Sequence, residues 1–362
     1  MFWQRCAAAP GCRGRAAEPY GGCPAHLSPR EFERFVDALR PGAEIDLRGV
    51  TVPSWLLEAV LDAVTGPDGR PHLGRTRFDG AVLPSDASLR GFCVEGDSSF
   101  DGACFLGFTS FHDARFFGNA SFRDARFGQD VSFRGARFHR HASFEEAAFT
   151  GEVTFAEATW HADASFRHTV FMAPVSFDHA GFGRDAAMQA ACFGEPVCFE
   201  HVQVMRHARL ERTRFRHGLA IGPMVTGGGL GLEGAIVHGG AHIHAAAQRV
   251  TARGMIVHGD AVFELRYASL DLEDAVIQGA VAVRSLKEPI PGIAEPSSWT
   301  GPPGARLTSL LRTDAELIHL TDVDLGGCTL GPRRSKALRV AGTRPPSAIT
   351  RRSWLRRATG RL

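Results

Sequence analysis

The chain has 362 residues, of which 44% are apolar, so it could fill one long repeat domain or two or three globular domains. Its 26 phenylalanines against 2 tyrosines indicate that aromatic side chains serve as apolar filler. No stretch approaches the roughly 18 uninterrupted apolar residues of a membrane span, and the first residues lack the apolar run of a secretory signal. We therefore expect a cytoplasmic protein whose eight cysteines are free thiols or metal ligands.

The net charge of +2 hides an uneven distribution along the chain. Residues 331–362 contain ten of the 41 lysines and arginines and no acidic residue. Residues 1–330 therefore carry 31 basic and 39 acidic side chains, a net charge of −8.

Residues 1–71 are predicted to form a small head that begins with a candidate metal site. Its four candidate ligands, Cys6, Cys12, Cys23 and His26, follow the spacing C-x5-C-x10-C-x2-H in a stretch rich in Gly and Pro. Three thiolates and one imidazole suit tetrahedral zinc, and four protein ligands leave no open position, so the zinc would be structural. The alternative is a set of unrelated thiols in a frayed chain end.

Two helices are predicted in the same head. Ser28 and Glu31 form a capping box with Pro29 at the first helical position, before FERFVDALRPG. PSWLLEAVLDAVTG (53–66) is the second helical pattern. We expect these helices to cover the open end of a solenoid, which would otherwise expose unpaired backbone.

Apolar residues recur at alternating steps of five and six from Phe78 to Ile221 without losing step. The most regular part of the series is Phe100, Phe105, Phe111, Phe116, Phe122, Phe127, Phe133, Phe138, Phe144, Phe149 and Phe155. A small or β-branched residue lies two positions before nearly every member, so each short extended segment points one small and one large side chain inward. This spacing fits neither a helix nor a lone strand; it predicts a chain that coils around its own axis.

Four such segments close one coil of 22 residues, and residues 22 apart should stack about 4.8 Å above one another. The inward positions then form four unbroken apolar columns, one of which contains Phe100, Phe122, Phe144 and Phe166. On the outside, Arg123, Glu145 and Arg167 alternate in sign at the same spacing. We expect the sixth residue to relax alternate corners around the large rings.

The repeat region is assigned to residues 72–286, regular to 221 and then built of narrower coils with smaller inward residues. Residues 287–304 are a Pro/Gly-rich loop, and 305–330 are predicted to form the final coil or coils. Residues 331–362 are interpreted as a basic tail that binds phosphates of nucleic acid or an anionic membrane surface, or that has no specific partner.

The repeats DGACF (101–105), DARFG (124–128) and RGARF (134–138) resemble the pentapeptide repeat family, in the Phe-centred form with alternating spacing seen in actinobacterial proteins. The Leu-centred form occurs once, loosely, as IDLRG (45–49). The resemblance implies an all-β solenoid, a right-handed quadrilateral β-helix, here with a small α-helical, Cys-containing head.

Other candidates for chemistry are weaker. Cys93, Cys104, Cys192 and Cys198 fall on outward positions with no general base at a readable spacing. Stacking by 22 aligns His139 with His161, and Glu157 with His179 and His201, which allows a surface metal site or simply solvated histidines. TGGGLGLEGA (226–235) lacks the Lys-Ser/Thr of a phosphate loop and is interpreted as a solenoid turn.

No catalytic motif is evident, so we expect a protein that is not an enzyme. The first hypothesis is a scaffold that binds an unknown protein partner, with a homodimer through a solenoid end as a further possibility. The second is a DNA mimic that modulates a type II topoisomerase such as gyrase, as some pentapeptide repeat proteins do. Mimicry needs ordered negative charge, whereas the outward residues here mix both signs.

Overall fold

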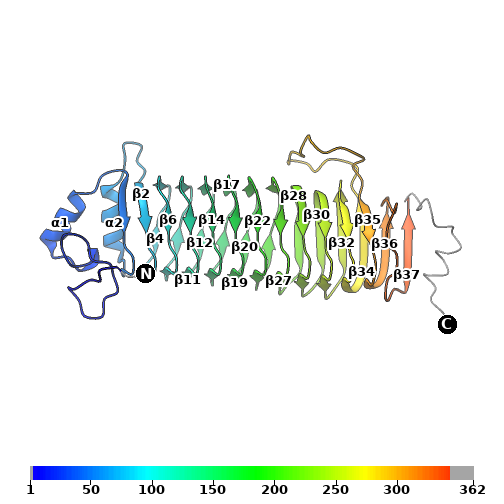
Figure 1. The fold of residues 1–362 in the computed structure, drawn as a ribbon, viewed down its shortest axis with the longest axis horizontal. Coiled ribbons are helices and arrows are strands. Elements are labelled where there is room, and N and C mark those ends of the chain that lie inside the picture. The colour runs from blue at the N-terminus through cyan, green and yellow to red at the C-terminus, as the bar shows by residue number, and fades with distance from the viewer. Residues whose placement is uncertain (1–2, 343–362) are drawn as a thin grey trace. The chain divides into compact units, whose positions relative to one another are not determined.

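The computed structural model describes residues 3–342 (Figure 1). The chain divides into two compact units, Met1–Ser176 and Phe177–Leu362. Residues 343–362, and with them most of the segment predicted to be a basic tail, lie outside the described residues. Within residues 3–342, no helix is long and apolar enough to cross a lipid bilayer.

The N-terminal head contains the two predicted helices, preceded by the short 3-10 helix η1 (Pro24–His26). Helix α1 (Pro29–Asp37) begins with the predicted capping box, in which the Ser28 backbone N–H donates to Glu31 Oε2 at 2.9 Å. Helix α2 (Ser54–Ala63) buries three apolar side chains, whereas α1 buries none and contacts α2 through an edge-to-face ring pair of Phe32 and Trp55 at 5.0 Å.

The solenoid starts earlier than the predicted boundary at residue 72. Strand β1 (Ala43–Asp46) pairs in parallel with β2 (His72–Arg77), and Leu47 and Val50 beside it are fully buried. The loose Leu-centred repeat at 45–49 is thus a genuine coil segment. The predicted start at residue 72 is too late because helix α2 is inserted between this segment and the next coil. Its helical sequence pattern hides the short repeat before it.

The other strands of the first unit are two residues long and run in sequence order around the coils. They are β3 (Val82–Leu83), β4 (Ala87–Ser88), β5 (Cys93–Val94), β6 (Ser98–Ser99), β7 (Cys104–Phe105), β8 (Thr109–Ser110), β9 (Arg115–Phe116), β10 (Ala120–Ser121), β11 (Arg126–Phe127), β12 (Val131–Ser132), β13 (Arg137–Phe138), β14 (Ala142–Ser143), β15 (Ala148–Phe149), β16 (Val153–Thr154), β17 (Thr159–Trp160), β18 (Ala164–Ser165), β19 (Val170–Phe171) and β20 (Val175–Ser176).

These strands pair with the predicted register of 22. Ala120 lies opposite Ala142, and Phe127 lies opposite Phe149. Rings in one column stack nearly parallel, with centroids 4.7 Å apart for Phe100 and Phe122. Neighbouring columns meet edge to face, as Phe122 and Phe133 do at 5.5 Å and 87°. Both arrangements suit the ring quadrupole, so the columns gain more than buried area alone.

The corners explain the alternation of five and six. Each five-residue step turns through a residue with φ between 54° and 66°, two positions after the inward apolar residue, as at Asp113, Asp124 and Glu146. A backbone hydrogen bond closes the turn, for example from Ala114 N–H to Phe111 O at 3.1 Å. This is the third position of a tight turn that needs positive φ. The six-residue steps turn without such a residue, in keeping with the expectation that the extra residue relaxes them.

The second unit begins with coils of the same kind and continues with longer strands. Its strands are β21 (Gly181–Phe182), β22 (Ala186–Ala187), β23 (Cys192–Phe193), β24 (Val197–Cys198), β25 (Val202–Val204), β26 (Ala208–Arg209), β27 (Arg214–Phe215), β28 (Leu219–Gly231), β29 (Ile236–Val237), β30 (Ala241–Thr251), β31 (Ile256–Val257), β32 (Ala261–Arg266), β33 (Ser269–Asp271), β34 (Val276–Ser285), β35 (Arg306–Ser309), β36 (Asp314–Thr321) and β37 (Ala337–Ala341).

After residue 221 the coils use less chain than a Phe-lined coil. Between β28 and β30 the register shifts twice, from Leu219 opposite Ala241 to Gly229 opposite Arg249. The next pairing, Ala241 with Ala261, keeps the shorter offset of 20. The register shifts between β28 and β30 therefore mark the loss of the two extra residues of the Phe-lined coils.

The loop after β34 folds back along the second unit, beside β28 and β30 (Figure 1). Ile290 packs against Val225 and Ala246, and Trp299 Nε1 donates to Gly227 O at 3.2 Å. A buried ion pair at 2.7 Å joins Arg266 to Glu295 in the middle of the loop. This Pro/Gly-rich segment is thus an anchored lateral loop.

The solenoid also extends past the predicted end at residue 330. Leu317 in β36 lies opposite Ala337 in β37, again at an offset of 20, and Lys336 forms an ion pair with Glu316. Residues 331–342 are therefore part of the coil, and the interpretation of the tail as starting at 331 is wrong for them. The error arose because the boundary was drawn on charge, and outward lysine and arginine side chains are compatible with a strand.

Candidate metal centre and surface groove

The structure brings Cys6, Cys12, Cys23 and His26 together, with the four ligand atoms all within 4.8 Å of one another. Cys12 Sγ lies 3.8 Å from Cys23 Sγ, and Cys23 Sγ lies 3.3 Å from His26 Nδ1. Cys6 Sγ lies 3.6 Å from His26 Nδ1. Tetrahedral zinc with Zn–S bonds of about 2.3 Å and Zn–N bonds of about 2.0 Å places its ligand atoms roughly 3.5–3.8 Å apart. The donor set and its spacing fit that ion.

Local backbone structure positions these ligands. Residues Arg5 and Arg15 form an antiparallel bridge, and η1 brings the His26 ring back towards Cys23. A Cβ on Gly14 would lie 3.1 Å from Cys23 Sγ, so a side chain there would crowd the thiol. The Gly14 N–H also points at Cys12 Sγ, 3.4 Å away, and would stabilise a thiolate.

The electrostatics of the cluster also suit a cation. Burial raises the pKa of Cys23 to about 12, and the neighbouring charge of Cys12 adds to this effect. Burial acts in the same direction on Cys6, but hydrogen bonds from the Cys23 and Ala8 backbone and from His26 lower its pKa to about 6. The first thiolate therefore forms readily and a second is opposed by charge repulsion, which a divalent ion would remove.

The cluster is tied to the first coil of its unit. Arg15 forms an ion pair of 2.9 Å with Asp46 in β1, and its backbone N–H donates to Arg48 O at 2.8 Å. A metal bound by the four residues would therefore hold residues 6–26 against the start of the solenoid. Its chemistry would be structural, because the ligand set is complete.

The outward cysteines and histidines lie as their column positions predict, with one exception. The rings of His139 and His161 stack 4.7 Å apart, and those of His179 and His201 do the same. Cys93 is 3% exposed, so its prediction as an outward, accessible thiol is wrong. The turn before β2 carries Arg70 over this position, where it reaches Gly91 O at 3.5 Å, a contact that column arithmetic cannot show.

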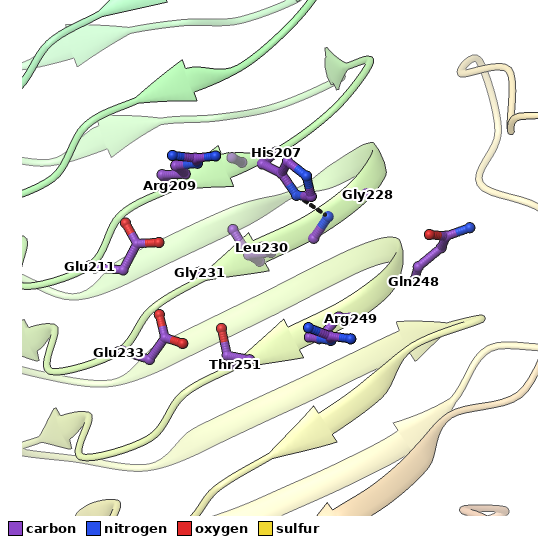
Figure 2. A pocket seen from close by; sticks show the side chains of 12 residues that line it. His207, Arg209, Glu211, Gly228, Leu230, Gly231, Glu233, Gln248, Arg249 and Thr251 are labelled. Carbon is purple, nitrogen blue, oxygen red and sulfur yellow. Dashed lines mark hydrogen bonds between the residues drawn. The ribbon is translucent and has the colours of Figure 1, made fainter.

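A polar groove of about 320 Å³ lies on the second unit where one coil lacks outward side chains (Figure 2). Gly229 lies opposite Arg249, and Gly231 lies between Arg209 and Thr251 in register. The Gly229 N–H donates to His207 Nδ1 at 3.1 Å, so a neutral His207 carries its proton on Nε2. The glycine run is visible in the sequence, but the groove is not, because its walls come from the coils on either side.

The groove separates two kinds of charge (Figure 2). His207 and Arg249 lie towards one end, and Glu211 and Glu233 towards the other. Arg209 is held by an ion pair of 2.9 Å with Asp185. Within the part of the chain that the structure describes, Arg249 and Glu233 form no ion pair, so their charges remain available to a ligand.

Comparisons with known proteins identify the repeat. A family model described as pentapeptide repeats (9 copies) matches residues 100–148 and 144–192. Among solved structures, the chain is similar to HetL, a pentapeptide repeat protein involved in heterocyst differentiation regulation from the cyanobacterium Nostoc sp. strain PCC 7120. The identity is 15%, the match covers 76% of this chain and 90% of HetL, and the TM-score is 0.20. No curated protein matches the chain.

Proposed function

Because residues 100–192 belong to the pentapeptide repeat family, we propose that the chain is a non-catalytic scaffold that binds a protein partner through the outward side chains of its coils. The observation that carries this proposal is the groove on the second unit, where Arg249 and Glu233 have charges without ion-pair partners among the described residues. Fold alone does not assign function, and this groove is the surface feature that favours binding of a partner.

The groove favours a polar peptide segment. Arg249 and the Nε2–H of His207 are donors for an acidic side chain, and Glu233 is an acceptor for a basic one. The glycine floor lets a peptide backbone approach closely, since no Cβ projects from Gly229 or Gly231. A partner segment with both charges would match the two ends of the groove.

The alternative function, mimicry of DNA toward gyrase, is less well supported by the charges. In the first unit Glu145 lies between Arg123 and Arg167, at 3.4 Å and 3.6 Å. In the second unit Glu273 pairs with Arg253 and Arg312, at 2.9 Å and 2.7 Å. Such alternation cancels the continuous negative potential that a mimic of a phosphate backbone needs.

The experiment is affinity capture with the full-length protein, the variant Arg249→Glu and the control Arg126→Glu, each analysed by quantitative mass spectrometry. Arg126 is an exposed outward arginine on a Phe-lined coil, so the control makes the same charge change elsewhere. We expect a protein retained by the wild type and the control and lost from Arg249→Glu, and the purified protein should reproduce this difference. Equal capture by all three would contradict the groove as the binding surface.

A gyrase supercoiling assay with the same three proteins separates the two functions. A scaffold without topoisomerase activity leaves supercoiling unchanged at stoichiometric concentrations. Inhibition by all three proteins would replace the scaffold proposal with mimicry.

A further inference from the structure

A second group of metal-ligating side chains lies in the second unit, far along the sequence from the N-terminal cysteines. The ligand atoms of Asp178, His179 and His201 all lie within 4.8 Å of one another. Asp178 and His179 occupy one corner, and His201 occupies the equivalent corner of the next coil. Both histidines have positive φ, 54° and 55°, so the tight turn presents both imidazoles from the same place on successive coils.

The two imidazoles are arranged as a pair with an unused nitrogen. Their centroids are 4.7 Å apart and the ring planes differ by 10°. His201 Nδ1 is shielded from solvent and has no hydrogen-bond partner among the described residues. A buried imidazole nitrogen without a partner is costly. In the tautomer with the proton on Nε2, this Nδ1 has a lone pair that a cation can use. His179 Nε2 lies 3.8 Å from Asp178 Oδ1, so a negatively charged carboxylate lies beside the two imidazoles.

The lateral loop closes over one side of this corner. A Cβ on Gly292 would lie 3.7 Å from His201 Cδ2, and Gln203 Nε2 donates to Ala294 O at 3.2 Å. His201 is therefore held between its coil and the loop, whereas the side chain of His179 is 58% exposed and can rotate. The His201 ring is therefore fixed in position, and the His179 ring can change its orientation.

From this arrangement we propose that Asp178, His179 and His201 bind a divalent transition-metal ion of the Zn²⁺, Ni²⁺ or Co²⁺ class. Two imidazoles and one carboxylate suit these ions, whereas Ca²⁺ and Mg²⁺ prefer oxygen ligands. Tetrahedral bonds of about 2.0–2.1 Å bring the ligand atoms to about 3.3 Å from one another. Rotation of the exposed His179 out of the parallel stack supplies that approach.

The proposed site differs from the N-terminal centre in the number of coordination positions that the protein fills. Three protein ligands leave a coordination position for water or for a side chain of another molecule, whereas the set of three cysteines and one histidine is complete. The site does not depend on the groove between Arg209 and Arg249 or on the proposed function.

The chain offers a matched negative control in the first unit. His139 and His161 stack at the same centroid distance of 4.7 Å, with ring planes 11° apart, but the charged neighbours of His139 are Arg137 and Arg115. Two imidazoles without a carboxylate, beside guanidinium groups, should bind a cation weakly. A comparison of the two pairs therefore isolates the contribution of Asp178 and the corner around it.

The test is equilibrium dialysis of untagged full-length protein against Ni²⁺, with bound metal counted by atomic emission. The variants are His201→Ala, Asp178→Asn and His179→Gly, and the control is His161→Ala. His179→Gly removes the imidazole but keeps a residue that tolerates positive φ, so this variant should fold. Each of the three variants should lose one equivalent of Ni²⁺ relative to the wild type, and His161→Ala should lose none. Any metal bound at the N-terminal centre should remain in all of them.

The proposal is overturned if His201→Ala and His179→Gly bind as many equivalents as the wild type. It is also overturned if His161→Ala loses the same equivalent, because stacked histidines alone would then account for the binding. Co²⁺ provides a second readout through its visible absorption bands, which change with the ligands. The bands assigned to this site should disappear in Asp178→Asn and persist in the control.

Discussion

The coils lined with phenylalanine and those lined with aliphatic residues both enclose a packed apolar interior, but one coil of each kind uses a different number of residues. In the Phe-lined coils, paired residues are 22 apart in the sequence, as Phe127 and Phe149 are. In the aliphatic coils they are 20 apart, as Val257 and Ile277 are. Stacked rings need a wider cross-section than valine or isoleucine, and interiors tolerate little empty space. The volume of the inward side chains thus sets how much chain one coil uses.

The corners differ in the same way. In the Phe-lined coils a residue with positive φ recurs at two corners of every coil, for example at Asp124, Gly135 and Glu146. In the aliphatic coils one corner keeps this conformation, at Gly234, Gly254 and Asp274. At the other corner the long strand β30 runs straight through in one coil, whereas Tyr267, with φ of 58°, turns the chain between β32 and β33 in the next. The coil that contains β30 therefore replaces one tight turn by continuous strand.

The largest expected effect comes from removing a ring from a Phe-lined coil. Phe133 is fully buried between stacked rings, so Phe133→Ala should reduce the free energy of unfolding by about 3–5 kcal/mol. Chemical denaturation measures this loss. A reduction below about 1 kcal/mol would mean that the column does not depend on its rings, and the comparison between coil types would fail.

Metal removal should act on the start of the solenoid in the first unit and not on the aliphatic coils of the second unit. If the N-terminal centre holds zinc, a chelator or Cys23→Ser should destabilise the region around β1 by about 3–4 kcal/mol, the value for a ligand present at 100 to 1,000 times its dissociation constant. Hydrogen exchange should show faster exchange near Leu47 and Val50 and no change in β30 to β34. Unchanged exchange near β1 after metal removal, or equal acceleration in both regions, would count against a metal-held cap.

Adding a ring should separate the two interiors. Val257→Phe places a ring in one of the narrower aliphatic coils and should cost about 1–3 kcal/mol, because the interior is too narrow. Val204→Phe is the matched control, since Val204 lies in register with Phe182 and a ring there can stack. Thermal unfolding should show a clearly larger loss for Val257→Phe. Equal losses would show that ring volume does not determine coil length.

The smallest effect concerns the corners. Glu146 has φ of 60°, a conformation that costs a residue with a Cβ about 1–2 kcal/mol relative to glycine, so Glu146→Gly should stabilise the protein by up to about 1 kcal/mol. Glu152→Gly, in a six-residue corner without positive φ, should be neutral or destabilising. If both variants shift the denaturation midpoint in the same direction, the assigned corner geometry is wrong.

The register, the four-sided coil and the change to narrower coils follow from the order of the residues alone. The register of 22 has no alternative, because every inward position must be apolar. A shift of the strand pairing by one residue would place a polar side chain among the rings. For the same reason Phe133 and Phe155 could be identified as buried before the structure was known. The capping box of α1 is local chemistry, and it was also predictable.

The ends of the solenoid and the groups of side chains that converge depend on the folded chain. Strands β1 and β37 lie in segments whose composition suggests a head and a tail, and they became strands because a neighbouring coil offers unpaired backbone groups. The groove beside Gly229 and the closure of Gly292 over His201 depend on residues from different coils and from the lateral loop. Residue types indicated cysteine and histidine chemistry, but distances between ligand atoms arise from the folded chain, since sequence spacing alone does not fix the path of a loop.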